Sequence, residues 1–223
     1  MRQSVADLAT VESQSRNRIR DAALKQFAAH GFKGATVRGI ALEAGVSPGG
    51  VQHYFRSKQA LRDDCDAYVR TFLRETMDMG AVSGAVTDAA FVADTHRAVA
   101  LVVPYLAMSL VSDAPTASRW FDELAGLYHG VLTGGELGVG LPPDEDIAAI
   151  VAVYTAMQLG LASLTRHVYR RLGADERDPA ATARIGRARL YLATARLIGV
   201  ELEASIRAGL AEYQRWGKQR RSR

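Results

Sequence analysis

The sequence predicts an all-α protein, with a small N-terminal head of three helices and a larger C-terminal helical bundle. Apolar residues recur every three or four positions through most of the 223 residues, which is the period of an amphipathic helix. No segment shows the strict alternation of a half-buried strand. Hydrophobic residues make up 48% of the chain, enough for a sizeable core in a chain of this length.

The first expected helix lies in the head. Residues 1–15 show no sustained periodicity, so we expect a polar and mobile arm there. The helix that follows places Ile19, Ala23 and Phe27 on one face. Gly31 comes directly after the last periodic residues, where a left-handed C-cap would end the helix at residue 30.

Two short helices are expected next, each with a recognisable start. Thr36 is a suitable N-cap for a helix over 37–44, and Gly45 provides a turn. Ser47 is the second N-cap and Pro48 occupies the first helical position. Two short helices joined by a turn of about three residues are typical of a helix-turn-helix.

The remaining helices form the larger part of the chain. Ser57 opens a long helix with a continuous apolar stripe, which ends in the small-residue segment 79–86. Pro104 lies inside the next helix, where we expect a kink. Turn chemistry then separates further helices, at roughly 87–112, 116–133, 144–172, 180–199 and 201–216. The expected domains are an arm at 1–15, a helix-turn-helix domain at 16–56 and a helical domain at 57–223.

Charge is distributed unevenly along the chain. Residues 1–62 hold ten Lys/Arg against four Asp/Glu, a net charge of +6, whereas residues 63–223 hold eighteen against twenty, a net charge of −2. A basic head on a body of opposite sign suggests that the head binds a polyanion. Charge alone does not say which one.

Cysteine use and the N-terminus indicate the compartment. Cys65 is the only cysteine, so an intrachain disulfide is excluded, and Asp7 and Glu12 interrupt any apolar signal segment. We therefore expect a cytoplasmic protein. The charge-free stretch 147–165 is nearly long enough to cross a bilayer, but its polar residues favour a buried bundle helix and we expect no membrane contact.

The residues most indicative of function lie between 36 and 58, which read TVRGIALEAGVSPGGVQHYFRSK. The outward positions of the second short helix are Gly49, Gly50, Gln52 and His53. Two glycines in a helical first turn cost roughly 1 kcal/mol each relative to alanine, and a close approach to a groove would explain them. Basic side chains stand around this face, namely Arg38, Arg56 and Lys58.

This part of the chain resembles the tetracycline-repressor (TetR/AcrR) family of bacterial transcriptional regulators. The similarity runs from about Arg16 to Val69 and includes RDAALKQFAAHGFKGATVRGIALEAGVSPGGVQHYFRSKQAL. The resemblance implies an all-helical homodimer whose head binds double-stranded DNA. It also implies a C-terminal domain that pairs the subunits and often binds an inducer.

Carried over by position, the resemblance implies a recognition helix over 48–54. The implied DNA-binding residues are Thr36, Arg38, Ser47, Pro48, Gly49, Gly50, Gln52, His53, Tyr54 and Lys58. Many family members have tyrosine where this chain has Gln52, so Tyr54 is a candidate for the aromatic phosphate contact. His53 fits a base contact and a solvated surface position equally well. Arg16, Arg18 and Arg20 fit either a solvated helix face or a sequence-independent phosphate contact.

Signals for catalysis or metal binding are absent from the sequence. The five histidines have no paired spacing such as i, i+4 with an intervening glutamate, and a second cysteine is missing. The glycine-rich run 134–140 follows no strand and precedes two prolines, so we interpret it as a loop rather than a phosphate cradle. We expect no cofactor, no metal and no enzymatic activity.

The C-terminal part holds candidates for an interface and a pocket. Small residues at Ala152, Ala156 and Gly160 would let a second helix approach closely, and the apolar Leu190 and Leu197 lie further on. Intrachain packing explains such a face too, but the resemblance favours a four-helix subunit interface. The candidate pocket residues are Tyr105, Met108, Trp120, Leu124, Tyr128, Met157 and Gln158, although an ordinary core has the same composition.

The resulting hypothesis is a homodimeric, ligand-responsive DNA-binding regulator, in the first instance a repressor on a palindromic operator. Its expected partners are operator DNA, a second copy of the chain and a small apolar effector. The alternatives are a helical-bundle enzyme and an interaction module whose basic head binds an acidic protein.

Overall fold

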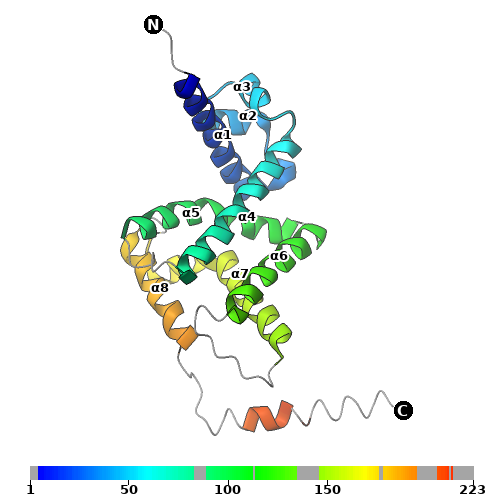
Figure 1. Ribbon diagram of the computed structural model, residues 1–223, viewed down its shortest axis with the longest axis vertical. Helices are drawn as coiled ribbons and strands as arrows, with labels where there is room; N and C mark the ends of the chain where they lie inside the picture. The colour runs from blue at the N-terminus through cyan, green and yellow to red at the C-terminus, as the bar shows by residue number, and fades with distance from the viewer. Residues whose placement is uncertain are drawn as a thin grey trace, which may run out of the picture. The chain divides into compact units, whose positions relative to one another are not determined.

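The computed structural model describes residues 5–82, 89–112, 114–134, 146–175, 178–194, 205–210 and 212, and no strand occurs among them (Figure 1). The predicted all-α class is therefore confirmed for the described part of the chain. The chain divides into two compact units, Met1–Thr165 and Arg166–Arg223. The named helices are α1 (Val5–Gly34), α2 (Val37–Ala44), α3 (Pro48–Tyr54), α4 (Lys58–Val82), α5 (Ala89–Ser112), α6 (Ala114–Thr133), α7 (Ile147–Leu172) and α8 (Pro179–Thr194).

Helix α1 differs from the prediction at both ends. It begins at Val5, so most of the expected arm is helical. The side chains at 12–18 are nearly all exposed and polar, which is why hydrophobic periodicity could not find this part of the helix. Gly31 has φ 66° and ψ 170°, a conformation almost restricted to glycine. The predicted break at Gly31 is therefore confirmed, but its ψ is not that of the expected left-handed C-cap, and a further short segment continues to Gly34.

The other boundaries agree closely with the pattern-based prediction. Helices α2 and α3 begin after the predicted N-caps. The Ser57 hydroxyl accepts a hydrogen bond from the backbone N–H of Ala60 at 3.0 Å, which caps α4. Pro104 lies inside α5. Of the helix expected over 201–216, residues 205–210 and 212 are described and helical.

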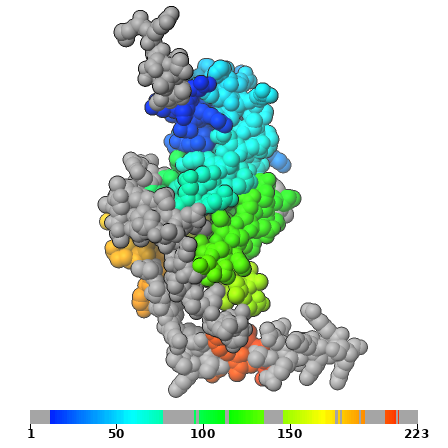
Figure 2. All heavy atoms as spheres, in the orientation of Figure 1, coloured from blue at the N-terminus to red at the C-terminus, as the bar shows by residue number. Residues whose placement is uncertain are grey.

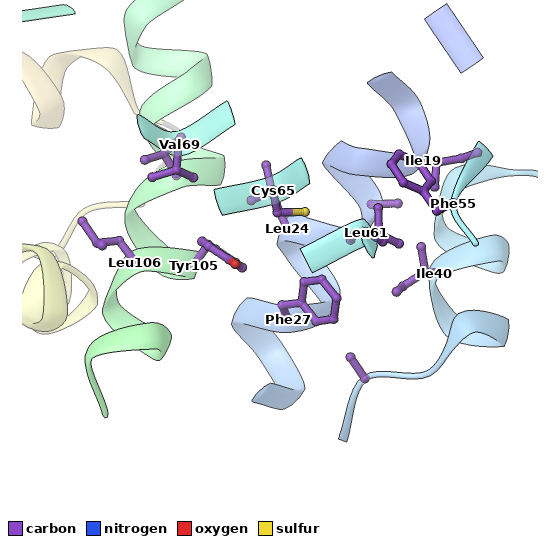
Figure 3. Close-up of a cluster of buried hydrophobic side chains, with 14 of the residues drawn as sticks. Ile19, Leu24, Phe27, Ile40, Phe55, Leu61, Cys65, Val69, Tyr105 and Leu106 are labelled. Atoms are coloured by element: carbon purple, nitrogen blue, oxygen red, sulfur yellow. The ribbon is translucent and has the colours of Figure 1, made fainter. Parts of the chain in front are cut away.

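One hydrophobic core runs through the first unit (Figure 3). In the head it is formed by Ile19 and Phe27 of α1 together with Ile40 of α2. Helix α4 continues it along one stripe, with Leu61, Cys65 and Val69 all fully buried. The same stripe then meets α5 and α6, whose buried residues in the cluster include Tyr105, Leu106, Trp120 and Leu124. The buried stripe of α4 therefore joins the buried residues of the head to those of α5 and α6 in a single core.

A polar seam joins α4 to α6 beside this core. Its α4 members are spaced by four residues, so they lie on one face of the helix. The Arg62 Nη2 atom lies 3.4 Å from the Thr116 hydroxyl, and the Arg119 Nη2 atom lies 3.3 Å from an Asp66 oxygen. Arg70 Nε donates to Glu123 at 2.6 Å. The charged residues along each helix alternate in sign. If one helix slid along the other by one turn, residues of like charge would face each other and repel. The seam therefore fixes how α4 and α6 are aligned along their axes.

Asp66 is the most deeply buried member of the seam, at 4% exposure. The Tyr105 hydroxyl donates a hydrogen bond to its other carboxylate oxygen, so both oxygens have partners, as a buried charge requires. Burial, with the nearby Asp66 charge, raises the pKa of Tyr105. Burial also raises the pKa of the Cys65 thiol, with smaller contributions from Asp64 and Asp66. Both groups are therefore held in their neutral forms.

We expect Tyr105→Phe to lower the free energy of unfolding at pH 7 by about 1.5–3 kcal/mol, because a buried carboxylate loses a charge-assisted hydrogen bond. Chemical denaturation measures this change. Tyr154→Phe is the matched control, since the Tyr154 ring packs edge-on against Tyr128 at 5.0 Å and its hydroxyl makes no polar contact within the described part of the chain. An equal loss of stability in both variants would contradict the role given to the Tyr105 hydroxyl.

The raised pKa of Tyr105 adds a pH dependence to the same experiment. Below about pH 10 the tyrosine is protonated in both the folded and the unfolded chain, so its pKa shift has no effect on stability. Above that pH the unfolded chain releases the proton while the folded chain retains it, so stability falls as pH rises. Tyr105→Phe should therefore show a shallower decline above about pH 10 than the wild type. Cys65 contributes to the decline in both.

Candidate nucleic-acid interface

The geometry of the two short helices is set by their caps and by one glycine. The Thr36 hydroxyl accepts a hydrogen bond from the Gly39 N–H at 3.0 Å, and the Ser47 hydroxyl accepts one from the Gly50 N–H at 3.0 Å. Between the helices, Gly45 has φ 67° and ψ 35°, a left-handed conformation that favours glycine. The predicted helix-turn-helix is therefore formed, with both predicted caps in place.

Helix α3 has one buried side and one open side. Val51 is buried and belongs to the same core cluster as Ile40 and Ala44 of α2. On the other side Gln52 and His53 are exposed. Tyr54 is half-buried and lies edge-on to His53, with ring centroids 5.0 Å apart. The head occupies the blue-to-cyan region of Figure 2.

The two glycines of α3 are not required by the chain's own packing. A Cβ atom added to Gly49 would lie 3.8 Å from its nearest neighbour, the Ser47 hydroxyl oxygen, which is ordinary contact. A Cβ atom on Gly50 would lie 3.4 Å from the same oxygen. Neither residue has a positive φ. A reason for glycine must therefore come from outside the described part of the chain, such as a surface that approaches closely.

The basic residues of the head differ in how far their charge is available. Arg38 and Arg56 are exposed. Arg16 forms an ion pair with Asp64, and its guanidinium lies 5.4 Å from the centre of the Phe55 ring. These two contacts attach α1 to the end of α3 and the start of α4. Arg18 is exposed, and its guanidinium lies 3.4 Å from the Ser15 hydroxyl.

Lys58 makes contacts within the protein that were not predicted from the sequence. Its ammonium donates hydrogen bonds to the backbone oxygens of Phe32 and Ala35, at 2.7 and 3.0 Å, and lies 4.6 Å from the centre of the Phe32 ring. Two of its three donors therefore stabilise the turn between α1 and α2. The predicted phosphate contact by Lys58 stays a prediction, and it would have to use the remaining donor.

The residues predicted to line a pocket do not all come together. Tyr105, Trp120 and Leu124 are buried in the core. Met108, Tyr128 and Gln158 are partly buried, and Met157 is exposed. A small cleft of about 10 Å³ adjoins Tyr105 and Met108, and its other walls are Phe27, Phe32, Arg62, Ser109 and Ser112. This space fits about one water molecule. The buried Trp120 indole N–H has no hydrogen-bond partner among the described residues.

The residues predicted to form a subunit interface lie on α7 where they are described. Ala152 and Ala156 are exposed and Gly160 is half-buried. Large apolar residues that the prediction omitted are exposed on the same helix, namely Val153, Met157 and Leu164. The side chain of Leu190 and the whole of Leu197 lie outside the described part of the chain.

Two further findings concern the described residues as a whole. They hold no group of three or more His, Cys, Asp or Glu side chains that could bind a metal ion. Among them, α7 alone is long and apolar enough to cross a membrane by length and composition, and only 17% of its most apolar window is buried within the chain. The exposed apolar face of α7 therefore needs an explanation.

We expect Gly49→Ala to raise the free energy of unfolding by roughly 0.5–1 kcal/mol, because alanine favours the helix and has room for its methyl group. The same change should weaken DNA binding, because the methyl group would meet the closely approaching surface. Gly126→Ala on α6 is the control, since its site is also open; it should stabilise the protein without changing DNA affinity. Unchanged DNA affinity for Gly49→Ala would contradict the explanation that Gly49 allows a surface to approach closely.

Comparisons with known proteins agree with this geometry. Residues 19–65 match the family model of bacterial regulatory proteins of the tetR family. The chain is 32% identical over 129 residues to the HTH-type transcriptional regulatory protein RaaS of Mycobacterium tuberculosis. This match covers 58% of the chain and 60% of the relative.

Two solved structures of proteins described as transcriptional regulators match a larger share of this chain, at lower sequence identity. The putative transcriptional regulator SCO4942 from Streptomyces coelicolor is 24% identical, with a TM-score of 0.48 over 78% of this chain and 95% of that one. A TetR transcriptional regulator from Chloroflexus aurantiacus is 19% identical, with a TM-score of 0.47 over 69% and 86%. Residues 19–65, with their two capped helices and left-handed glycine turn, are similar to the tetR family of bacterial regulatory proteins.

Proposed function

We propose that this protein is a sequence-specific DNA-binding transcriptional regulator that acts as a homodimer, in the first instance as a repressor. The observation that carries the proposal is the outward face of α3, where uncharged polar side chains adjoin two glycines that the chain's own packing does not require. The family match over 19–65 and the similarity to a protein named as an HTH-type regulator support it. A cytoplasmic location accords with this function.

DNA recognition follows from placing α3 in the major groove. Gln52 is the longest uncharged polar side chain on the exposed face, and its amide has the geometry to pair with N6 and N7 of adenine. Arg38 on α2 and Arg56, which follows the end of α3, are exposed and would supply charge for phosphates. Phosphate contacts position the protein, whereas base contacts specify the sequence.

A second copy of the chain is the proposed partner of α7. Val153, Met157 and Leu164 are 60%, 65% and 55% exposed, which leaves a row of large apolar side chains in water in a monomer. The small Ala152 and Ala156 beside them permit close helix approach. Pairing of α7 with its copy would cover this row, and a twofold dimer would present two copies of α3 to a palindromic operator.

An effector that weakens DNA binding completes the proposal. We place its site among the partly apolar residues of α5, α6 and α7, including Tyr105, Trp120 and Tyr128. The buried Trp120 N–H, which lacks a partner among the described residues, favours a ligand with a hydrogen-bond acceptor. The effector would favour a dimer in which the two recognition helices no longer match successive major grooves.

Selection of bound sequences from a random duplex pool tests the central claim. A palindromic consensus with half-site centres about 34–36 Å apart is the expected result. Enrichment of no sequence would overturn sequence-specific regulation, and would favour an interaction module whose basic head binds any polyanion.

We expect Gln52→Ala to flatten the base preference at one position of each half-site, because a bidentate contact is worth roughly 1–3 kcal/mol of discrimination. Binding measured against a panel of single-base operator variants gives the preference at each position. His53→Ala serves as the neighbouring comparison and should have a smaller effect. If Gln52→Ala loses affinity but keeps the wild-type preference at every position, Gln52 contacts only the backbone and specificity arises elsewhere, for example from DNA deformability.

Ala156→Glu should convert dimers to monomers and reduce operator affinity, because a large charge would prevent close packing of α7 against its copy. Sedimentation velocity at micromolar concentration measures the mass of each variant. Ser118→Glu, at an exposed position of α6, adds the same charge away from this face and should remain dimeric. A monomeric wild type at that concentration would contradict the dimer, and recovery of the wild type only in a detergent-extracted membrane fraction would assign α7 to the bilayer instead.

A further inference from the structure

A cleft opens where the head meets α4 and α5. Its described walls are Phe27 and Phe32 of α1, Arg62 of α4, and Tyr105, Met108, Ser109 and Ser112 of α5. The rings of Phe27 and Tyr105 lie next to each other, with centroids 6.2 Å apart (Figure 3). None of the described wall residues belongs to α6 or α7. The cleft therefore faces the head, rather than the α6 and α7 residues of the effector site proposed above.

The Ser109 hydroxyl at this cleft lacks a hydrogen-bond partner. Ser109 is only 5% exposed, and its hydroxyl bonds to no atom within the described part of the chain. The neighbouring Ser112 hydroxyl differs, because it donates to the Met108 carbonyl oxygen at 2.7 Å. Buried hydroxyl groups in proteins usually have a partner. A partner for Ser109 would have to come from outside the described residues, through the cleft that this side chain lines.

The Arg62 guanidinium at the same cleft lacks an acidic partner. Its Nη2 atom lies 3.4 Å from the Thr116 hydroxyl, and its central carbon lies 4.8 Å from the centre of the Phe32 ring. By contrast, Arg70 and Arg119 each form an ion pair with a carboxylate. Arg62 is half-buried, so its charge is only partly screened by water. Most of its N–H donors remain unused among the described residues.

The nearest carboxylate along the same face of α4 does not satisfy Arg62. Asp66 follows one turn later, and its two oxygens already accept from Tyr105 and Arg119. A guanidinium fork beside a free hydroxyl donor is the arrangement that recognises a carboxylate. The cleft thus offers a positive charge and two kinds of donor to an acceptor that the described part of the chain does not supply.

The size of the cleft limits what can enter. Its volume of about 10 Å³ is that of a site for one water molecule, and one carboxylate oxygen is of similar size. The space grows to about 220 Å³ when its open mouth is included, where a short apolar chain would contact Phe32 and Met108. Methionine adapts its shape easily to such a neighbour. A phosphate group would bring several charged oxygens into a space sized for one.

We infer that this cleft binds a small monocarboxylate, with one carboxylate oxygen hydrogen-bonded to the Arg62 guanidinium and the Ser109 hydroxyl. The short carbon chain of the acid lies against Phe32 and Met108. Because few atoms make contact, the dissociation constant is on the order of 1–10 mM. The inference concerns only residues of the first unit and does not depend on DNA recognition by α3. An occupant of the cleft would contact the head and α5 at once.

The test uses the full chain with ¹³C-labelled methionine methyl groups and follows them by NMR. Sodium acetate is the probe, exchanged against sodium chloride at constant ionic strength, and Met108→Leu assigns the Met108 signal. We expect that signal to shift in a saturable way, with half-saturation on the order of 1–10 mM. Acetamide has nearly the same shape as acetate but carries no charge, so it should give no saturable shift over the same range.

Two variants test the two proposed donors. Arg62→Gln should raise the half-saturation concentration by about ten- to a hundredfold, because a charged hydrogen bond is lost. Ser109→Ala should raise it by about two- to tenfold. Ser109→Ala should also leave the midpoint of thermal unfolding in chloride unchanged, since its hydroxyl has no partner to lose within the described residues. Arg74→Gln, at an exposed position of the same helix, is the control and should bind acetate as the wild type does.

Four outcomes would overturn the inference. They are a Met108 signal that acetate does not move, which leaves water as the occupant, an equal response to acetamide, a common shift of every methionine signal, and unchanged acetate binding in both Arg62→Gln and Ser109→Ala. Acetate binding is measured without DNA, so neither success nor failure here bears on sequence-specific regulation, which the selection experiment decides.

Discussion

Helix α4 is the constraint on which the rest of the first unit depends. Its single buried stripe of Leu61, Cys65 and Val69 packs against the head at one end and against α5 and α6 at the other. Only residues 55–57 separate it from α3, and Phe55 among them is buried. The first turn of α4 and helix α3 must therefore move together, because moving one alone would expose core side chains.

The polar contacts around α4 define where it can sit. A hydrophobic stripe tolerates small sliding movements, whereas a buried carboxylate with partners on two other helices does not. Asp66 contacts both Tyr105 on α5 and Arg119 on α6, and Arg70 lies 5.2 Å from the centre of the Trp120 ring while also pairing with Glu123. Apolar burial supplies most of the stabilisation, and these contacts select one arrangement among several of similar burial.

Local signals made much of the head predictable from the sequence. Thr36 and Ser47 act as caps because their hydroxyls can reach a backbone N–H three residues on, and Gly45 fits the left-handed turn because it lacks Cβ. Such signals need only a few neighbouring residues. The α4 stripe was predictable for a similar reason, since Leu61 and Cys65 follow the helical period.

Other features depend on residues far apart in the sequence, and the pattern could not supply them. The carbonyl oxygens that bind Lys58 belong to Phe32 and Ala35, more than twenty residues earlier. The polar seam pairs α4 with residues more than fifty positions away. The four-residue spacing of Arg62, Asp66 and Arg70 is visible in the sequence and indicates one polar face of a helix. It does not indicate which other helix packs against that face. The start of α1 at Val5 was missed because the polar run 12–18 interrupts the apolar period that Ile19 and Ala23 begin.

The open sites at Gly49 and Gly50 have a consequence for how such a protein diversifies. At Gly49 an added Cβ atom would make only ordinary contact, 3.8 Å from the Ser47 hydroxyl oxygen, whereas at Gly50 it would lie 3.4 Å from that oxygen and 3.5 Å from the Val46 Cβ. A small substitution at Gly49 therefore changes the surface offered to a ligand without disturbing the packing beneath it. Over evolutionary time, the target preference of this head can therefore change faster than its scaffold.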